Sequence, residues 1–175
     1  MRRLADRERI ERLLRALGDE AIQEGRVYLT GGATAVLYGW RETTVDVDLK
    51  LVPDQDAVLR AIPRLKERLE LNVELASPAD FIPELPGWQE RSPFVGRLGK
   101  LSAYHYDLHA QALAKIERGH ARDLADVREM LDRGLIQREN LLPWFEAIEP
   151  SLYRYPAIDP VSFRRNVEAA AGAPH

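Results

Sequence analysis

The sequence contains no cysteine, which excludes disulfide bonds, thiolate catalysis and cysteine-ligated zinc or iron–sulfur centres. It also lacks any apolar run close to the roughly 20 residues that a membrane-spanning helix needs. The first residues, MRRLADRERIERLL, have no apolar segment of the kind that a signal peptide contains. We therefore expect a cytoplasmic protein with no membrane partner.

The chain has no marked excess of charge of one sign, since 25 Lys and Arg stand against 28 Asp and Glu. A dedicated binder of duplex nucleic acid is usually basic over a whole face, and the net charge of -3 does not indicate one. Hydrophobic residues make up 45% of the chain, which excludes disorder of the whole chain. We predict a main domain over residues 1–142 and a helical or irregular C-terminal extension over residues 143–175 that packs on it.

Hydrophobic periodicity predicts helices that alternate with strands. Apolar residues at helical spacing predict helices over residues 4–24, 33–38, 53–69 and 110–131, the last interrupted or softened at Gly119. Alternating residues predict strands over 27–30, 45–51 and 69–76, then a proline-rich loop over 77–93 and a hairpin that turns near Gly99. The second arm of this hairpin would place His105, Asp107 and His109 on one face. The order of elements indicates an α/β or α+β fold with a mixed sheet.

The stretch VYLTGGATAVLYGWRETTVDVDLKLV, residues 27–52, carries two aspartates one residue apart on a predicted strand. Asp46 and Asp48 would point to the same face, about 6.6 Å apart along the strand. Carboxylates so placed suit Mg²⁺, which takes oxygen ligands and needs few of them from the protein. Two aspartates that merely face water would give the same pattern, so the pair alone does not indicate a site.

The residues before the pair favour a site for a nucleotide. Gly31 and Gly32 end a strand and begin a helix, and glycines there let backbone N–H groups approach a phosphate closely. Arg41 could pair with a phosphate through two N–H groups, and the hydroxyl of Thr44 could support a metal ion or a phosphate. Together these residues predict binding of a nucleotide with its metal ion.

The segment GGATAVLYGWRETTVDVDL resembles the signature of the polymerase-β-like nucleotidyltransferase superfamily, in which a glycine turn and a short helix precede Asp-x-Asp on a strand. It is most similar to the AbiEii-like nucleotidyltransferases and the small stand-alone bacterial proteins related to them. A second segment, ALAKIERGHARDLADVREML, resembles the Lys-x-x-Arg and Arg-Asp-x-x-Asp helix motif of those proteins. The resemblance covers much of residues 27–131. It implies a polymerase-β-like fold, a mixed sheet flanked by helices with a helical C-terminal segment.

The resemblance also implies a role for each matching residue. The glycine turn, helped by Thr34, would bind the triphosphate, and the two aspartates of the strand would hold Mg²⁺ or Mn²⁺. Lys115 would reach the nucleotide phosphates, and Asp123 would organise the site or assist the nucleophile. Arg122 and Asp126 would tie their helix to the core, because buried charges usually need partners. An ordinary solvated helix with charge pairs would account for this second segment taken by itself.

Two points of the resemblance are incomplete. Many active members of the superfamily carry a serine directly after the first glycine, where this chain has Gly32, although relatives with two glycines are also active. A third metal-binding and catalytic carboxylate is expected on a later strand. Glu74 has the right strand and polarity, Asp107 is its competitor and Asp80 comes third.

The resemblance implies an enzyme that moves a nucleotidyl group from an NTP to tRNA or another RNA end, or to a protein hydroxyl. It also implies a place in a toxin–antitoxin pair as the toxin, with a cognate antitoxin protein as partner. The alternative is a catalytically silent protein of the same fold that binds a nucleotide or a protein partner.

Overall fold

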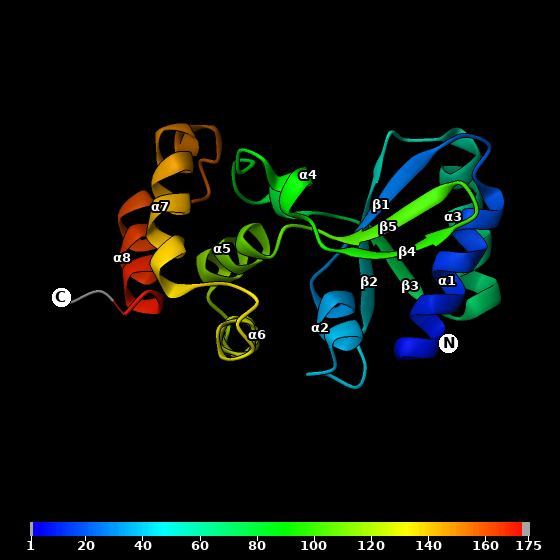
Figure 1. Ribbon diagram of the computed structural model, residues 1–175, viewed down its shortest axis with the longest axis horizontal. Coiled ribbons are helices and arrows are strands. Elements are labelled where there is room, and N and C mark those ends of the chain that lie inside the picture. Colours follow the sequence, from blue (N-terminus) through cyan, green and yellow to red (C-terminus); the bar gives the residue numbers. More distant parts are fainter. Residues whose placement is uncertain (1, 173–175) are drawn as a thin grey trace. The chain divides into compact units, whose positions relative to one another are not determined.

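Residues 2–172 are described by a computed structural model, which divides into two compact units (Figure 1). The first unit comprises the residues up to Ser77 together with Ser92–Tyr106, and the second comprises Pro78–Arg91 together with the residues from Asp107 on. The predicted boundary between residues 142 and 143 falls inside the helix Arg138–Ile148 of the second unit. The compact units are therefore divided at other places than the sequence suggests.

The first unit contains a five-stranded mixed sheet. Its strands, in spatial order, are β3 (Asn72–Leu75), β2 (Asp46–Val52), β1 (Gly25–Thr30), β5 (Leu101–His105) and β4 (Phe94–Leu98). The pairs β2–β3 and β1–β5 are parallel, whereas β1–β2 and β4–β5 are antiparallel. This confirms the predicted α+β class with a mixed sheet. The polymerase-β-like fold stays a prediction.

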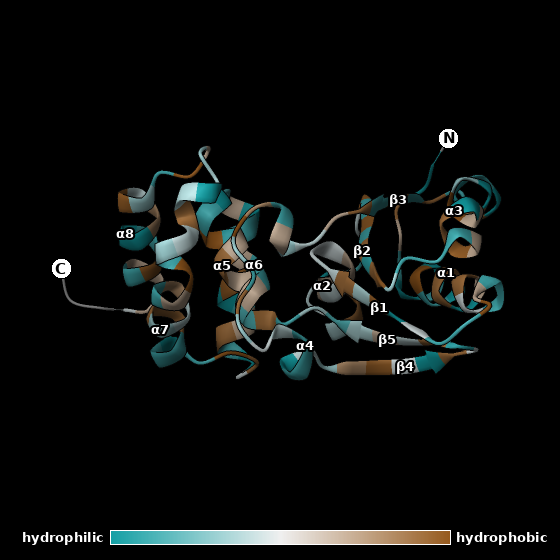
Figure 2. Cartoon of the chain, turned by 90° about the horizontal axis from the view of Figure 1, so that it is seen from above, coloured by the Kyte–Doolittle hydropathy of each residue, from teal (hydrophilic) through white to brown (hydrophobic). Residues whose placement is uncertain are grey.

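Three helices belong to the first unit: α1 (Arg7–Glu20), α2 (Gly32–Tyr38) and α3 (Asp56–Leu69). Figures 1 and 2 show α1 and α3 beside each other on one side of the sheet, and their apolar side chains form a single buried cluster with those of the strands. The predicted helix over 4–24 is shorter, because the side chain of Asp6 caps α1 by accepting a hydrogen bond from the N–H of Arg9.

The two faces of β2 differ in polarity, as the alternation in the sequence predicts. Val47 and Leu49 are buried in the cluster with α1 and α3, and Asp46 and Asp48 are half-buried. Successive side chains of a strand point to opposite faces, so the two aspartates lie on the face that these helices do not cover. The fold thus places the predicted site on the second face of the sheet.

The second unit is helical. It contains α4 (Trp88–Arg91), α5 (Leu108–Arg118), α6 (Ala121–Asp132), α7 (Arg138–Ile148) and α8 (Pro160–Ala170), with 3₁₀ turns at Pro78–Asp80 and Glu149–Arg154. Of the two alternatives predicted for residues 110–131, the interruption at Gly119 is confirmed, because Gly119 ends α5 in a left-handed conformation with φ of 73°. The segment 77–93, predicted as a loop, contains a 3₁₀ turn and α4.

The second arm of the predicted hairpin is too long. Strand β5 ends at His105, and Asp107 is the N-cap of α5, where its side chain accepts a hydrogen bond from the N–H of His109 (3.2 Å). His105, Asp107 and His109 therefore do not share one strand face. An aspartate side chain readily accepts hydrogen bonds from the backbone N–H groups at the start of a helix. This preference for the N-cap outweighs the alternating pattern that predicted a longer strand.

Candidate functional site

Strand pairing brings the predicted carboxylates together. In the parallel pair of β2 and β3, Asp48 stands opposite Glu74 and Asp46 stands opposite Asn72. Paired residues of neighbouring strands point to the same face, and neighbouring strands lie about 4.8 Å apart. Of the three candidates for a third carboxylate, Glu74 is thus the one placed on the same sheet face as the two aspartates.

Asn72 links the carboxylates, a role that was not predicted. Its side-chain N–H group donates to the carboxylate of Asp46 and lies 3.4 Å from Oε1 of Glu74. One nitrogen atom is therefore within hydrogen-bond distance of two carboxylates, and its partial positive charge offsets their repulsion. The alternating pattern of β3, which puts Asn72 on the same face as Glu74, was the sequence feature that could have indicated this role.

The glycine turn lies directly against this group. Gly31 connects β1 to α2 with φ of 63° and ψ of -130°, a conformation that side chains with a Cβ rarely adopt. A Cβ added there would lie 3.3 Å from Oδ2 of Asp48. The backbone of the turn and the carboxylate of Asp48 are thus neighbours, as the predicted site requires.

Gly32 fits closely against Thr44. A Cβ at Gly32 would lie 2.6 Å from the Cβ of Thr44, far inside the normal contact distance, and the hydroxyl of Thr44 donates to the carbonyl of Asp46 (3.1 Å). A serine after the first glycine would collide with this threonine. The glycine at position 32, where many members of the superfamily have a serine, is therefore required by the threonine at position 44.

Thr34 does not offer its side chain to a ligand. It is fully buried, its hydroxyl is 3.0 Å from Nδ1 of His105 and 3.4 Å from the carbonyl of Leu29, and it has no exposed surface with which to touch a phosphate. Burial, with a further contribution from the charge of Arg7, lowers the pKa of His105 to about 4, so its ring is neutral at pH 7. The predicted role of Thr34 is corrected to support of the core behind the turn.

Arg41 lies three residues after the last residue of α2. The helix ends at Tyr38, and the N–H of Arg41 is 3.4 Å from the carbonyl of Ala35. Ala35 lies in the middle of α2, so the chain folds back along the helix after Gly39. The contact of Arg41 with a phosphate stays a prediction.

The predicted helix residues form an ion-pair cluster within the second unit. Nζ of Lys115 is 2.8 Å from Oδ2 of Asp126 and 3.7 Å from Oδ1 of Asp123, and all three side chains are buried. Arg118 donates to both oxygens of Asp123 at 2.8 and 2.5 Å. Asp126 ties its helix to α5 through Lys115, as predicted. Arg122, predicted to do the same, is exposed, and the arginine that links the two helices is Arg118.

This pairing also acts on the pKa of Asp123. Burial would raise the pKa of Asp123, but the hydrogen bonds and charge of Arg118, the charge of Lys115 and the backbone N–H of His120 outweigh it, and the pKa lies below its ordinary value. An ionised Asp123 held by two cations is a poor general base. The predicted roles of Lys115 at the phosphates and Asp123 at the nucleophile stay predictions.

The other two candidates for the third carboxylate belong to the second unit. Asp107 is buried and accepts hydrogen bonds from Nε and Nη2 of Arg91 at 3.2 and 2.8 Å. Burial would raise the pKa of Asp107, but the hydrogen bonds of His109 and Arg91 outweigh it and hold the pKa below its ordinary value. Asp80 closes the 3₁₀ turn Pro78–Asp80. Glu74 is therefore the best candidate.

The donor set of the site suits a hard cation. Asp46, Asp48 and Glu74 supply only oxygen atoms, the ligands that Mg²⁺ and Mn²⁺ prefer. Within residues 2–172, however, no three His, Cys, Asp or Glu side chains are gathered closely enough to hold a metal ion. Three carboxylates repel one another, and the amide of Asn72 lies between two of them. The residues fit a divalent ion in kind, provided that Asn72 moves aside.

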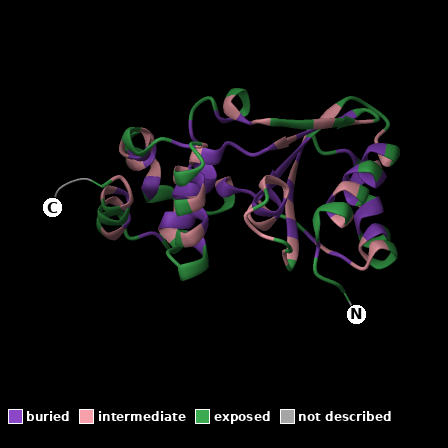
Figure 3. Ribbon diagram, turned by 60° about the horizontal axis from the view of Figure 1, so that its bottom comes forward, coloured by how far each residue is buried: buried purple, intermediate pink, exposed green. Residues whose placement is uncertain are grey.

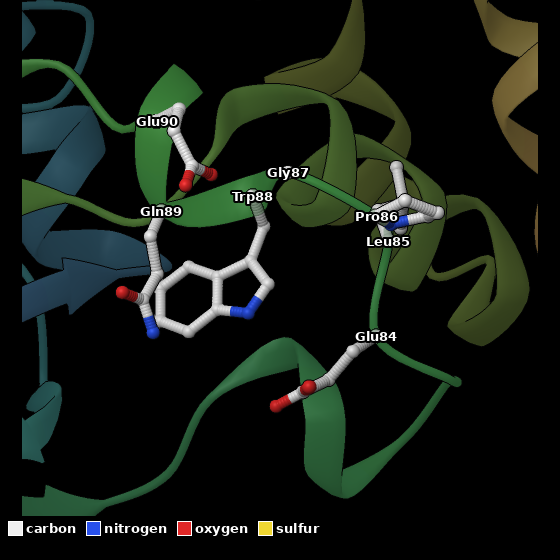
Figure 4. Close-up of a pocket in the computed structure, with 7 residues that line it drawn as sticks. All are labelled: Glu84, Leu85, Pro86, Gly87, Trp88, Gln89 and Glu90. Carbon is white, nitrogen blue, oxygen red and sulfur yellow. The ribbon is translucent and has the colours of Figure 1, made fainter.

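Two cavities of the second unit contain none of the predicted site residues. One, of about 340 Å³, is lined by residues 84–90, and Figure 4 shows the indole of Trp88 with the carboxylates of Glu84 and Glu90 around it. Two carboxylates without a lining cation would repel a triphosphate. The other, of about 430 Å³, has mainly apolar walls with Arg128 and Arg138 among its lining residues.

Across residues 2–172, none of the helices combines the length and the apolar character that crossing a membrane requires. Comparison of the chain with models of protein families, with curated proteins and with solved structures found no match.

Proposed function

We propose that the chain is a metal-dependent nucleotidyltransferase, which moves a nucleotidyl group from an NTP to a hydroxyl of an RNA such as tRNA or of a protein. One observation carries the proposal: Asp48 stands opposite Glu74 on the sheet, and its carboxylate lies 3.3 Å from where a Cβ of Gly31 would be. A carboxylate pair beside a glycine turn combines oxygen ligands for a cation with backbone N–H groups for phosphate oxygens.

The residues of the site divide the work between them. The backbone of Gly31 and Gly32 would hold the phosphates, since neither glycine has a side chain of its own to shield its N–H group. Asp46, Asp48 and Glu74 would hold Mg²⁺ or Mn²⁺, which supplies Lewis-acid stabilisation of the attacking oxygen and of the departing pyrophosphate. The oxygen of the acceptor hydroxyl forms a bond to the α-phosphorus, the bond from this phosphorus to the bridging α,β oxygen breaks, and pyrophosphate leaves while the hydroxyl proton passes to solvent water.

A second candidate function is a catalytically silent protein that binds a nucleotide or a protein partner. It is favoured by the absence of a ready group of three metal ligands among residues 2–172. It is also favoured by Lys115, whose charge is already compensated by two aspartates of its own unit. If the silent protein binds a nucleotide, the two candidates differ only in turnover; if it binds a protein partner alone, they differ in nucleotide binding as well.

Transfer of label separates the two functions. The protein is incubated with α-labelled NTPs, Mg²⁺ or Mn²⁺ and total RNA, and the label is followed into RNA and into protein. We expect transfer that is lost in Asp46→Asn and Asp48→Asn and kept in Asp54→Asn, an exposed aspartate of the same unit. Binding without transfer to either class of acceptor would favour the silent protein.

The resemblance further suggests a toxin with an antitoxin protein as partner. Transfer to tRNA that stops on addition of a co-purified partner protein would support this part of the proposal. A protein whose expression leaves growth unchanged and whose activity no partner inhibits would contradict it, without touching the proposed transfer reaction.

A further inference from the structure

A row of aromatic side chains crosses the same face of the sheet that carries the carboxylates. Phe94 of β4 stands opposite Tyr104 of β5, Tyr104 opposite Tyr28 of β1, and Tyr28 opposite Lys50 of β2. Directly paired residues share a face. Four neighbouring strands, each about 4.8 Å from the next, give this row a length of about 14 Å.

The rings of the row contact one another. The centroids of Phe94 and Tyr104 are 5.5 Å apart in an edge-to-face arrangement, and those of Tyr104 and Tyr28 are 5.4 Å apart and stacked. Tyr28 is buried and supports the row, whereas Phe94 is 62% exposed at the start of an edge strand. Figure 3 shows β4 as mostly exposed, and Figure 2 shows its first residues as hydrophobic. An exposed phenylalanine beside a stacked tyrosine pair is a surface that a planar ligand could cover.

Two cations accompany the rings. The guanidinium of Arg26 lies over Tyr104, 5.3 Å from its centroid, and donates to the hydroxyl of Tyr28 at 3.3 Å. Lys50 ends the row on β2. Arg97, the next cation along β4, is already bound to both oxygens of Glu24 at 2.7 and 2.8 Å. The row therefore brings two cations rather than a broad basic patch.

The row adjoins the carboxylates. Lys50 is two residues from Asp48 on β2, which places the two side chains on one face about 6.6 Å apart along the strand. In the same way Tyr28 is two residues from Thr30, the partner of Asp48. Tyr28 lies between Phe94 and these carboxylates and is fully buried, so a strand bound at Phe94 reaches the carboxylates by passing over Tyr28.

We propose that this row binds single-stranded nucleic acid, with a base stacked on exposed Phe94, which Tyr104 supports, and phosphates near Arg26 and Lys50. An exposed aromatic side chain stacks a base in this way whatever the sequence. The proposal rests on the proposed function in one respect, that the bound strand presents its terminal hydroxyl to the carboxylates as the acceptor. A duplex does not fit, because its bases are stacked on one another and its backbone demands more than two cations.

Binding is tested without NTP and in the presence of a chelator, so that catalysis plays no part. The probe is a fluorescein-labelled single strand of about 12 nucleotides, as RNA or as DNA, and its anisotropy is followed as the whole protein is added. Phe94→Ala should weaken binding about fivefold or more, the effect of losing one stacked base. Tyr153→Ala is the matched control, since Tyr153 is 73% exposed and also lies beside an arginine, Arg154, 5.6 Å away.

The salt dependence tests the cations separately. Each neutralised phosphate of a single strand contributes about -0.7 to the slope of log K against log salt, so two cations predict a slope of about -1.4. Arg26→Gln should reduce the magnitude of this slope by about 0.7, and Arg154→Gln should leave it unchanged.

The outcomes distinguish this inference from the proposed function. Absence of binding to either single strand, equal binding of Phe94→Ala and the wild type, or equal competition by a duplex overturns the inference. Label transfer to a protein acceptor alone, with no binding of a strand, overturns it and leaves the proposed transferase intact. Binding of a strand by a protein that transfers no label supports the row and contradicts the transferase.

Discussion

A single added carbon at Gly32 tests the packing of the glycine turn. The Cβ of an alanine there would lie 2.6 Å from Cβ and 3.4 Å from Cγ2 of Thr44, and real Cβ atoms essentially never come within 3.0 Å of another heavy atom. Thr44 cannot relieve the contact by rotating its side chain, because its Cβ is attached to backbone that exchanges two hydrogen bonds with Ala5, at 2.8 and 2.9 Å. The segment that leads into β2 must move instead.

The expected cost follows from two opposing terms. Overpacking of this kind destabilises by about 1–3 kcal/mol. Replacement of glycine by alanine in a helix interior returns up to about 1 kcal/mol, and less at the first residue of α2. We therefore expect Gly32→Ala to lower the free energy of unfolding by about 1–2 kcal/mol, which lowers Tm by about 2–8 °C.

The assay is thermal unfolding followed by circular dichroism, with Gly96→Ala as the control. Gly96 is in the same unit, and a Cβ added there would meet nothing within 4 Å. Thr44→Gly should remove most of the penalty of Gly32→Ala in the double variant, so the two changes should be strongly non-additive. If Gly32→Ala unfolds at the same temperature as Gly96→Ala, the close fit of the turn against Thr44 is refuted.

Three further predictions concern the surroundings of the site. The unfolded chain takes up a proton on His105 below about pH 6.5, whereas the folded chain does so only near pH 4, so the free energy of unfolding falls as the pH drops from 6.5 to 4. Between pH 7 and pH 4 the wild type should lose about 3 kcal/mol more of its free energy of unfolding in urea than His105→Gln. Parallel plots of this free energy against pH for the two proteins would contradict the prediction. Lys115→Met leaves Asp126 buried without its cation and should cost about 3–5 kcal/mol, most of it restored in the double variant with Asp126→Leu; unchanged stability in urea would show that Lys115 is not structural. Gly31→Ala forces a Cβ into φ of 63° near Asp48 and should cost about 1–3 kcal/mol in thermal unfolding, so an unaltered Tm would argue against this backbone conformation.

The alternation of residues in the sequence was enough to predict β2 and its polar face. A period of two residues is local, and Asp46, Val47 and Asp48 carry it within three positions. Glu74 could be placed on a polar strand face by the same argument. That Glu74 stands opposite Asp48 depends on the register in which β2 pairs with β3. The two residues are 26 positions apart, and neither strand's own sequence reveals this register.

Other parts of the site depend on contacts that no local pattern reveals. Thr34 was expected to face a phosphate, and it is buried because His105, 71 residues away, accepts or donates a hydrogen bond at its hydroxyl. Asp107 continued an alternating pattern, yet it caps α5 and pairs with Arg91. In both cases a polar side chain found a partner that the tertiary structure supplies, and that partner decided its role.

The fit between Gly32 and Thr44 is a further case of this kind. Both residues belong to the motif that suggested a nucleotide site, but the sequence does not show that a Cβ on one would collide with the other. Asn72 was likewise visible as a polar strand residue, and only the pairing of Asp46 with Asn72 shows that its amide lies among the carboxylates.

The central claim is that the carboxylates beside the glycine turn bind a nucleotide together with a divalent ion. It is tested most directly by the Tm of the wild type, Asp48→Asn and Asp54→Asn in the presence of each NTP, with Mg²⁺, with Mn²⁺ and with a chelator. At 100 times Kd a ligand of the folded state stabilises it by about 2.7 kcal/mol, which raises Tm by about 5–11 °C. We predict this rise for at least one NTP with the metal ion, its loss in Asp48→Asn and with chelator, and its retention in Asp54→Asn. No rise with any NTP, or an equal rise in Asp48→Asn, would contradict the account.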